Sequence, residues 1–98
     1  MLIKLFVEFL GTFFFLAVIM VAANSNIKWA FAPIGLALAL VIYWGGNISC
    51  GHFNPAVSIM FFANNQMTLS QLIFYIISQT LGGLGALLYY NQTKKYFK

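Results

Sequence analysis

The 98-residue sequence has very few charged or metal-binding side chains. It contains no arginine and no aspartate, only one glutamate, one histidine and one cysteine, and its five basic residues are all lysines. A single cysteine excludes an intrachain disulfide, and one cysteine with one histidine does not make a zinc site. A single carboxylate also excludes catalysis by a carboxylate pair. We therefore expect a protein that is not an enzyme and that needs no metal or other cofactor.

Hydrophobic residues make up 62% of the chain, and only 6% of its residues are charged. A soluble domain of this size could not cover such a surface with polar groups, so the composition indicates an integral membrane protein. The apolar segments are continuous and lack strand alternation, which favours an all-α membrane fold over a barrel. The lysines flank these segments, a placement that suits lipid headgroups rather than nucleic acid.

Three apolar segments are predicted to cross the bilayer, which takes about 20 residues as a helix. The Thr68-x-x-Gln71 capping-box pattern marks the start of the third, and Gly45-Gly46 is expected to end the second. We predict multi-pass spans at about residues 5–23, 29–44 and 70–90, within a single unit of residues 1–98.

The first apolar segment admits a second interpretation. A basic start, an apolar stretch and the small pair Ala22-Ala23 also resemble a secretory signal peptide. Glu8 argues against this, because a carboxylate near the start of the apolar region is unusual in such a signal. We expect the segment to be retained as a transmembrane helix.

Residues 47–58 form the only cluster of polar groups inside the apolar sequence, and we assign a re-entrant loop and half-helix to about residues 47–63. Asn54 is a strong N-cap and Pro55 is favoured at the first helical position, so a helix is expected to begin there. The run from residue 56 to residue 63 is too short to cross a bilayer. A helix that begins at mid-membrane is tolerated only inside protein or beside a water-filled cavity. We therefore predict a re-entrant loop followed by one half-helix.

Glu8, His52 and Gln79 are the other polar side chains predicted at membrane depth. Freed backbone groups need partners there, so we expect Glu8 and Gln79 to hydrogen-bond the loop, while His52 either lines a pathway or holds the loop. The positive end of the half-helix repels cations, and the Asn54 amide can donate to a neutral molecule. With carbonyls of residues 49–53 as acceptors, the pattern predicts a passive pathway for small uncharged solutes.

Three segments resemble the aquaporin and aquaglyceroporin family, specifically its N-terminal half. Ile-Ser-Cys-Gly-His-Phe-Asn-Pro-Ala-Val-Ser at 48–58 resembles its first Asn-Pro-Ala loop, and residues 8–12 and 75–83 resemble its first and third helices. The resemblance implies half of an aquaporin-like fold, in a channel for water or small neutral solutes such as glycerol. It implies pore or selectivity roles for Gly51, His52, Asn54, Pro55, Ala56 and Ile34, and loop support by Glu8 and Gln79.

The sequence also departs from the family pattern. Relatives usually carry a larger aromatic residue at the position of Ile34, so the resemblance implies a smaller and less aromatic wall there. Family members contain two halves in inverted orientation, whose half-helices meet at mid-membrane. This sequence has one half, and it lacks the arginine that the second half contributes.

Three arrangements are compatible with a single half. They are a fragment of a longer gene product, a half-channel completed by a separate chain, and a homo-oligomer inserted in both orientations. The alternative function is a non-conducting membrane protein that associates with itself or with a full-length channel. Small residues spaced four apart would support such association, namely Gly35 with Ala39, and Ser78, Gly82 and Ala86.

Overall fold

The computed structural model describes residues 1–97, which are almost entirely helical. The helices are α1 (Leu2–Ala23), α2 (Phe31–Ser49), α3 (Pro55–Ala63), α4 (Leu69–Thr93) and the short 3₁₀ helix η1 (Lys94–Phe97). This part of the chain contains no strand. The predicted all-α fold, with long apolar helices and one half-helix, is confirmed. Lys98, the last residue of the predicted unit, lies outside the described residues.

The long helices match the thickness of a bilayer. They contain 22, 19 and 25 residues, and a rise of about 1.5 Å per residue makes each long enough for a hydrocarbon core of about 30 Å. All three are apolar enough to span it. With 9 residues, α3 is only about 14 Å long, so it reaches roughly halfway across.

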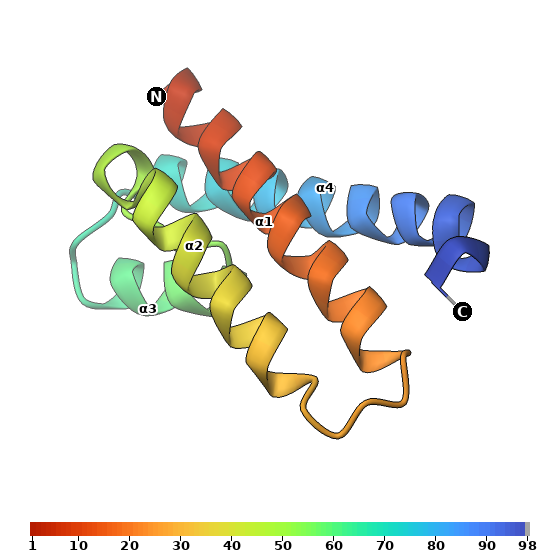
Figure 1. Cartoon of the computed structure of the whole chain (residues 1–98). Coiled ribbons are helices and arrows are strands. Elements are labelled where there is room, and N and C mark those ends of the chain that lie inside the picture. The colour runs from red at the N-terminus through yellow and green to blue at the C-terminus, as the bar shows by residue number, and fades with distance from the viewer. Residues whose placement is uncertain (98) are drawn as a thin grey trace.

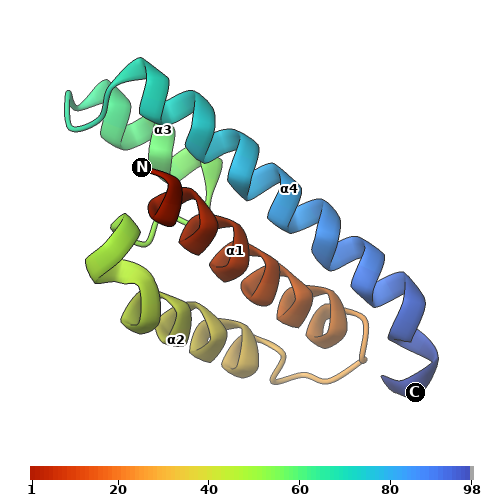
Figure 2. The ribbon, with the colours of Figure 1, turned by 90° about the horizontal axis from the view of Figure 1, so that it is seen from above.

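Helix α1 lies between α2 and α4 and packs against both (Figures 1 and 2). Helix α3 packs against α4. The end of α2, the whole of α3 and the start of α4 gather at the end of the bundle that carries the N-terminus (Figure 2). This arrangement brings the loop before α3 next to the first turns of α1.

Small residues let α1 and α4 approach closely. Ser78, Gly82 and Ala86, the predicted row of small residues, are all buried. A side-chain carbon at Gly82 would lie 2.7 Å from the carbonyl oxygen of Phe9, which is closer than two such atoms can approach. This row is therefore covered by α1 within the chain and is not a surface for an external partner.

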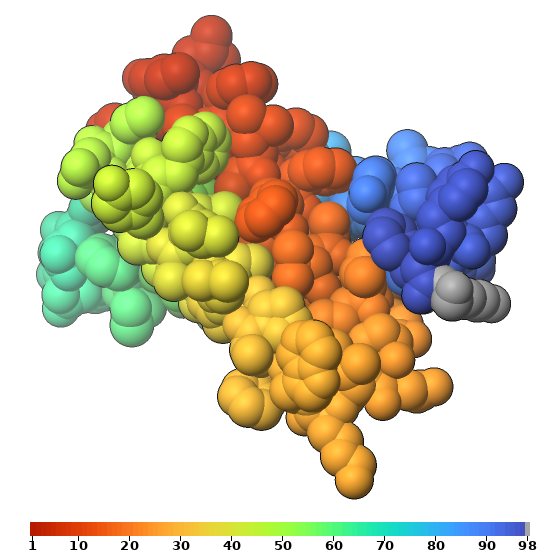
Figure 3. Space-filling view, in the orientation of Figure 1, coloured from red at the N-terminus to blue at the C-terminus, as the bar shows by residue number. Residues whose placement is uncertain are grey.

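Helix α2 is the most exposed of the long helices. It lies at the surface along its length, beside the protruding connection from α1 (Figure 3). Large side chains such as Phe31 and Tyr43 are exposed on it, as are the small residues Gly35 and Ala39. In a membrane protein such a face contacts lipid or another helix.

The structure corrects the predicted end of the second apolar segment. We expected Gly45-Gly46 to end the helix, but α2 continues to Ser49. A side-chain carbon at Gly45 would lie 2.6 Å from Val7 Cγ1 and 3.3 Å from the Phe53 ring. Gly45 therefore serves close packing, and the helix ends instead at Cys50, whose φ of 74° lies in the left-handed region.

Replacing Cys50 with glycine is expected to stabilise the fold by roughly 0.5–1 kcal/mol. A left-handed conformation costs a residue with a β-carbon about 1–2 kcal/mol, which exceeds the extra chain entropy of glycine, about 0.5–1 kcal/mol. Reversible unfolding in mixed detergent micelles, followed by circular dichroism, measures the difference. Cys50→Ala is the matched control and should be neutral, and equal effects of the two substitutions would contradict this explanation of the helix end.

Candidate functional site

The segment before α3 follows an unusual backbone path. Cys50, Gly51 and Phe53 have φ angles of 74°, 65° and 51°. Residues with side chains in this region cost on the order of 1–3 kcal/mol each, and they persist only where the surroundings determine the conformation. The contacts that hold this loop are therefore the core of the site.

Glu8 is the main partner of the loop backbone. Its side chain is fully buried, and its Oε2 accepts hydrogen bonds from the His52 amide at 3.1 Å and the Ser49 hydroxyl at 2.7 Å. Its Oε1 accepts from the Phe53 amide at 2.8 Å and from Gln79 Nε2 at 2.8 Å. Both carboxylate oxygens are thus occupied by donors, and two of these donors belong to the loop backbone.

Gln79 does not hydrogen-bond the loop backbone directly, although we expected it to do so. Its amide nitrogen donates to Glu8 Oε1 and, at 2.9 Å, to the hydroxyl of Ser58 on α3. Ser58 lies 2.8 Å from His52 Nδ1. Gln79 therefore links α4 to α1 and α3, and it positions Glu8 and His52 rather than the peptide groups between them.

Phe53 anchors the loop in the apolar core. Only 1% of its surface is exposed, and it packs with Val7 and Val41. Its ring occupies the space that a side chain at Gly11 would fill. Where α2 ends and the loop begins, the Tyr75 hydroxyl donates to the Ser49 carbonyl at 2.7 Å. The loop is therefore tied to α1, α2 and α4 at once.

Asn54 begins α3 as predicted. Its Oδ1 accepts a hydrogen bond from the Ala56 amide at 2.8 Å, and Pro55 occupies the first helical position. Because the oxygen is held by the backbone, the orientation of the side-chain amide is fixed and its Nδ2 hydrogens face away from the helix. The Asn54 side chain is exposed, and the described residues supply no acceptor for Nδ2.

Asn54 lies beside an open groove of about 630 Å³ between α1 and α4. Pro55, Phe53 and Gln79 also line this groove, and apolar residues such as Ile19 and Leu84 form much of the rest. Two buried oxygens at its wall, Thr12 Oγ1 and Gln79 Oε1, have no hydrogen-bond partner among the described residues. Both oxygens are enclosed by the protein, so they do not open to the groove themselves.

The structure divides the predicted site residues between two places. Asn54, Pro55 and Gln79 line the groove, whereas His52 lines a second, smaller cavity of about 160 Å³. Gly51 lies in the loop and lines neither, and the exposed Ala56 is in the first turn of α3. Ile34, half-buried on α2, lines neither.

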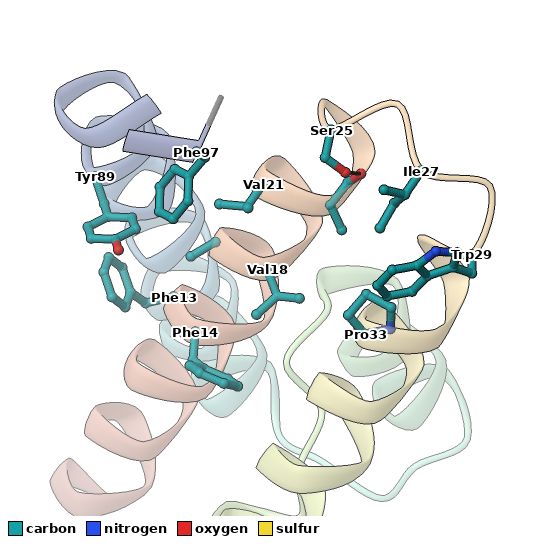
Figure 4. Close-up of a pocket in the computed structure, with 12 residues that line it drawn as sticks. Phe13, Phe14, Val18, Val21, Ser25, Ile27, Trp29, Pro33, Tyr89 and Phe97 are labelled. Carbon is teal, nitrogen blue, oxygen red and sulfur yellow. Dashed lines mark hydrogen bonds between the residues drawn. The ribbon is translucent and has the colours of Figure 1, made fainter. Parts of the chain in front are cut away.

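A third hollow is apolar and lies away from this network. It has a volume of about 640 Å³ and lies between α1, the α1–α2 connection, the start of α2, and α4 with η1. Phe14, Val18, Trp29 and Phe97 are in its wall (Figure 4). Its Ser25 hydroxyl already donates to the Ala22 carbonyl at 2.7 Å. This hollow has few groups that could orient a polar solute.

Sequence reasoning did not identify the side chains of Ser49, Ser58, Thr12 and Tyr75 as parts of the site. A serine or threonine in an apolar helix commonly bonds its own backbone, so these residues carried no separate signal. Tyr75 and Gln79 do lie four residues apart on one helical face. Because Gln79 was expected to support the loop, this spacing was the one sequence signal that could have identified Tyr75.

Comparison with known proteins agrees with this geometry. The profile of the major intrinsic protein family matches residues 1–97. The lens fiber major intrinsic protein of Lithobates pipiens is 37% identical over 98 residues, covering 90% of this chain and 36% of the relative. Aquaporin Z of Photorhabdus laumondii is 41% identical over 93 residues, covering 86% of this chain and 40% of the relative. The human lens fiber protein is 34% identical over 99 residues, which are 91% of this chain and 36% of the relative.

The match therefore extends over nearly the whole chain, although the chain spans only 36–40% of the length of these relatives. All of the described helices, and the loop before α3, lie within the matched residues. With three helices that can span a membrane, the chain is an integral membrane protein, and it belongs to the major intrinsic protein family.

Proposed function

We propose that this chain supplies one wall of a passive membrane pathway for water and small neutral solutes such as glycerol. The observation that carries the proposal is the hydrogen bonding of the Asn54 side chain. Its oxygen is held by the Ala56 amide, its Nδ2 hydrogens remain as donors, and the residue lines the groove. A fixed donor beside apolar walls favours a neutral molecule that can accept one hydrogen bond while it passes.

The other predicted residues have supporting roles in this proposal. The N-terminal end of α3 carries partial positive charge, which disfavours cations. Pro55 and Ala56 set the first turn of α3, and Glu8 and Gln79 hold the loop. Gly51, His52 and Ile34 do not line this groove, so their predicted pore roles depend on surfaces that the opposite wall would complete.

The pathway needs an opposite wall. In the proposal, residues 1–98 form one half-repeat, and a complementary half or a second copy in inverted orientation covers the groove. The passage is physical and not chemical, because both oxygens of the one carboxylate are already occupied by hydrogen-bond donors. We therefore propose a transport protein that is not an enzyme.

Asn54→Asp is expected to lower water flux several-fold without loss of the fold. Aspartate still caps α3 by accepting from the Ala56 amide, but it removes the Nδ2 donor and adds a negative charge. Osmotic shrinkage of liposomes that contain the protein, with any partner that co-purifies, measures the flux. Asn91→Asp, an exposed site on α4, is the matched control. Equal flux in the wild type and Asn54→Asp would contradict the proposal.

A second candidate is a non-conducting protein that associates with a full-length channel or with itself. The exposed Gly35 and Ala39 on α2 favour it, because small residues allow a neighbouring helix to approach. Co-purification with a full-length relative, no flux in liposomes, and loss of association in Gly35→Leu would support this candidate over the first.

A further inference from the structure

The small cavity beside His52 differs chemically from the groove at Asn54. It lies between the first turn of α1, the end of α2 and the connection from α3 to α4, and its volume is about 160 Å³. Lys4, His52, Gln66, Gln71 and Tyr75 are among the residues that line it. One water needs only about 10–15 Å³ by such a measure, so the cavity has room for a small polyatomic ion.

Two glutamines that line this cavity have amide nitrogens that are available to donate. Gln71 Oε1 accepts from the Thr68 amide at 2.9 Å, which is half of the capping box at the start of α4. Gln66 Oε1 accepts from Asn64 Nδ2 at 2.6 Å. Because each amide oxygen is held by a neighbour, each NH₂ group remains to donate to a ligand.

The hydrogen-bond network also determines which nitrogen of His52 carries the proton. The Gln79 amide nitrogen donates to the Ser58 hydroxyl, so the proton of that hydroxyl must go to another acceptor. Ser58 is fully buried, and His52 Nδ1 at 2.8 Å is the acceptor that the described residues offer. Nδ1 therefore accepts and Nε2 carries the hydrogen. Within residues 1–97, Nε2 has no hydrogen-bond partner and is not fully buried, and the His52 side chain lines the cavity, so Nε2 is available to a ligand there.

From this convergence of donors we propose that the cavity binds a small oxyanion, namely phosphate, either free or as part of an acidic lipid headgroup. Lys4 adds a positive charge, and no carboxylate lines the cavity among the described residues. The nearest acid, Glu8, has both oxygens covered by four donors. Ammonium and amide donors around an oxyanion form strong, charge-assisted hydrogen bonds. The N-terminus and the α3–α4 connection lie at the same end of the bundle (Figure 2). Because Lys4 and Gln66 from these segments line the cavity, its position suits a headgroup.

Titration of the ¹⁵N-labelled protein in neutral detergent micelles tests the proposal. Inorganic phosphate is exchanged for chloride at constant ionic strength, and the signals of the Gln71 side-chain amide and of His52 Nε2 are followed. We expect saturable shifts of both signals. A second arm replaces micelles with nanodiscs of phosphatidylcholine with or without phosphatidic acid, so that a bound headgroup is distinguished from free phosphate.

Gln71→Glu is the sharpest variant, because it retains the oxygen that accepts from Thr68 and replaces only the donor. It should weaken binding at least tenfold, and Lys4→Gln, at an exposed position, should weaken it several-fold if the first variant fails to fold. Lys94→Gln, which lies outside the cavity, should bind as the wild type does. Saturable shifts with either phosphate source support the site. Absence of shifts in both arms, or equal weakening by Lys94→Gln, would overturn it, and neither result depends on solute flux.

Discussion

Replacing Glu8 with glutamine is expected to destabilise the protein by about 2–4 kcal/mol and to release the loop before α3. The His52 amide binds one carboxylate oxygen and the Phe53 amide binds the other. Whichever way the new amide is turned, its NH₂ group therefore faces one of these two N–H groups. A buried donor that loses its acceptor costs about 1–3 kcal/mol, and the bond from Ser49 or Gln79 is weakened as well.

Hydrogen exchange provides the specific measurement for this variant. The amides of His52 and Phe53 should be strongly protected in the wild type and should exchange much faster in Glu8→Gln, because the loop opens locally. Lys4→Gln, one helical turn away on the exposed side of α1, is the control and should cost less than about 1 kcal/mol. Unchanged protection of both amides in Glu8→Gln would show that the carboxylate does not hold the loop.

Gly82→Ala is expected to cost about 1–3 kcal/mol, the usual range for overpacking. The added carbon would meet the Phe9 carbonyl oxygen at 2.7 Å and the Phe13 nitrogen at 3.1 Å. These are backbone atoms of α1, so they cannot move aside as a side chain can. The two helices must separate, and this separation disturbs Gln79, one turn earlier on α4, and its bond to Glu8.

Gly35→Ala is a matched control for this substitution. It makes the same change inside a long helix, but nothing lies within 4 Å of the added carbon. It should stabilise the helix slightly, by up to about 1 kcal/mol, because alanine is the better helix former. Unfolding free energies of the two variants should therefore have opposite signs. Equal effects would contradict the close approach of α1 and α4 at Gly82.

The parts of the fold that depend on local chemistry could be predicted from the sequence. Asn54 followed by Pro55 marked the start of the half-helix, and Thr68 with Gln71 marked the start of α4, and both caps are present. The three long apolar runs indicated the membrane helices, and all three are confirmed as candidate spans. These signals need only neighbouring residues and the period of a helix, so a single sequence contains them.

The parts that depend on long-range packing could not be predicted. Gly45 looked like a helix end because its neighbour is also glycine, yet it makes room for Val7. The link from Gln79 through Ser58 to His52 joins residues on α4, α3 and the loop. The left-handed φ of Phe53 depends on the pocket beside Gly11. None of these contacts is visible before the helices are placed together.

Contact between water and the Asn54 side chain is the most direct test of the central claim, that Asn54 presents its amide to a polar pathway. Solid-state NMR of the protein in hydrated lipid bilayers can measure magnetisation transfer from water to the Asn54 Nδ2 hydrogens. We expect transfer as strong as that to the exposed Asn91 amide. Transfer as weak as that to the buried Gln79 amide would place Asn54 away from water and would contradict the proposed pathway.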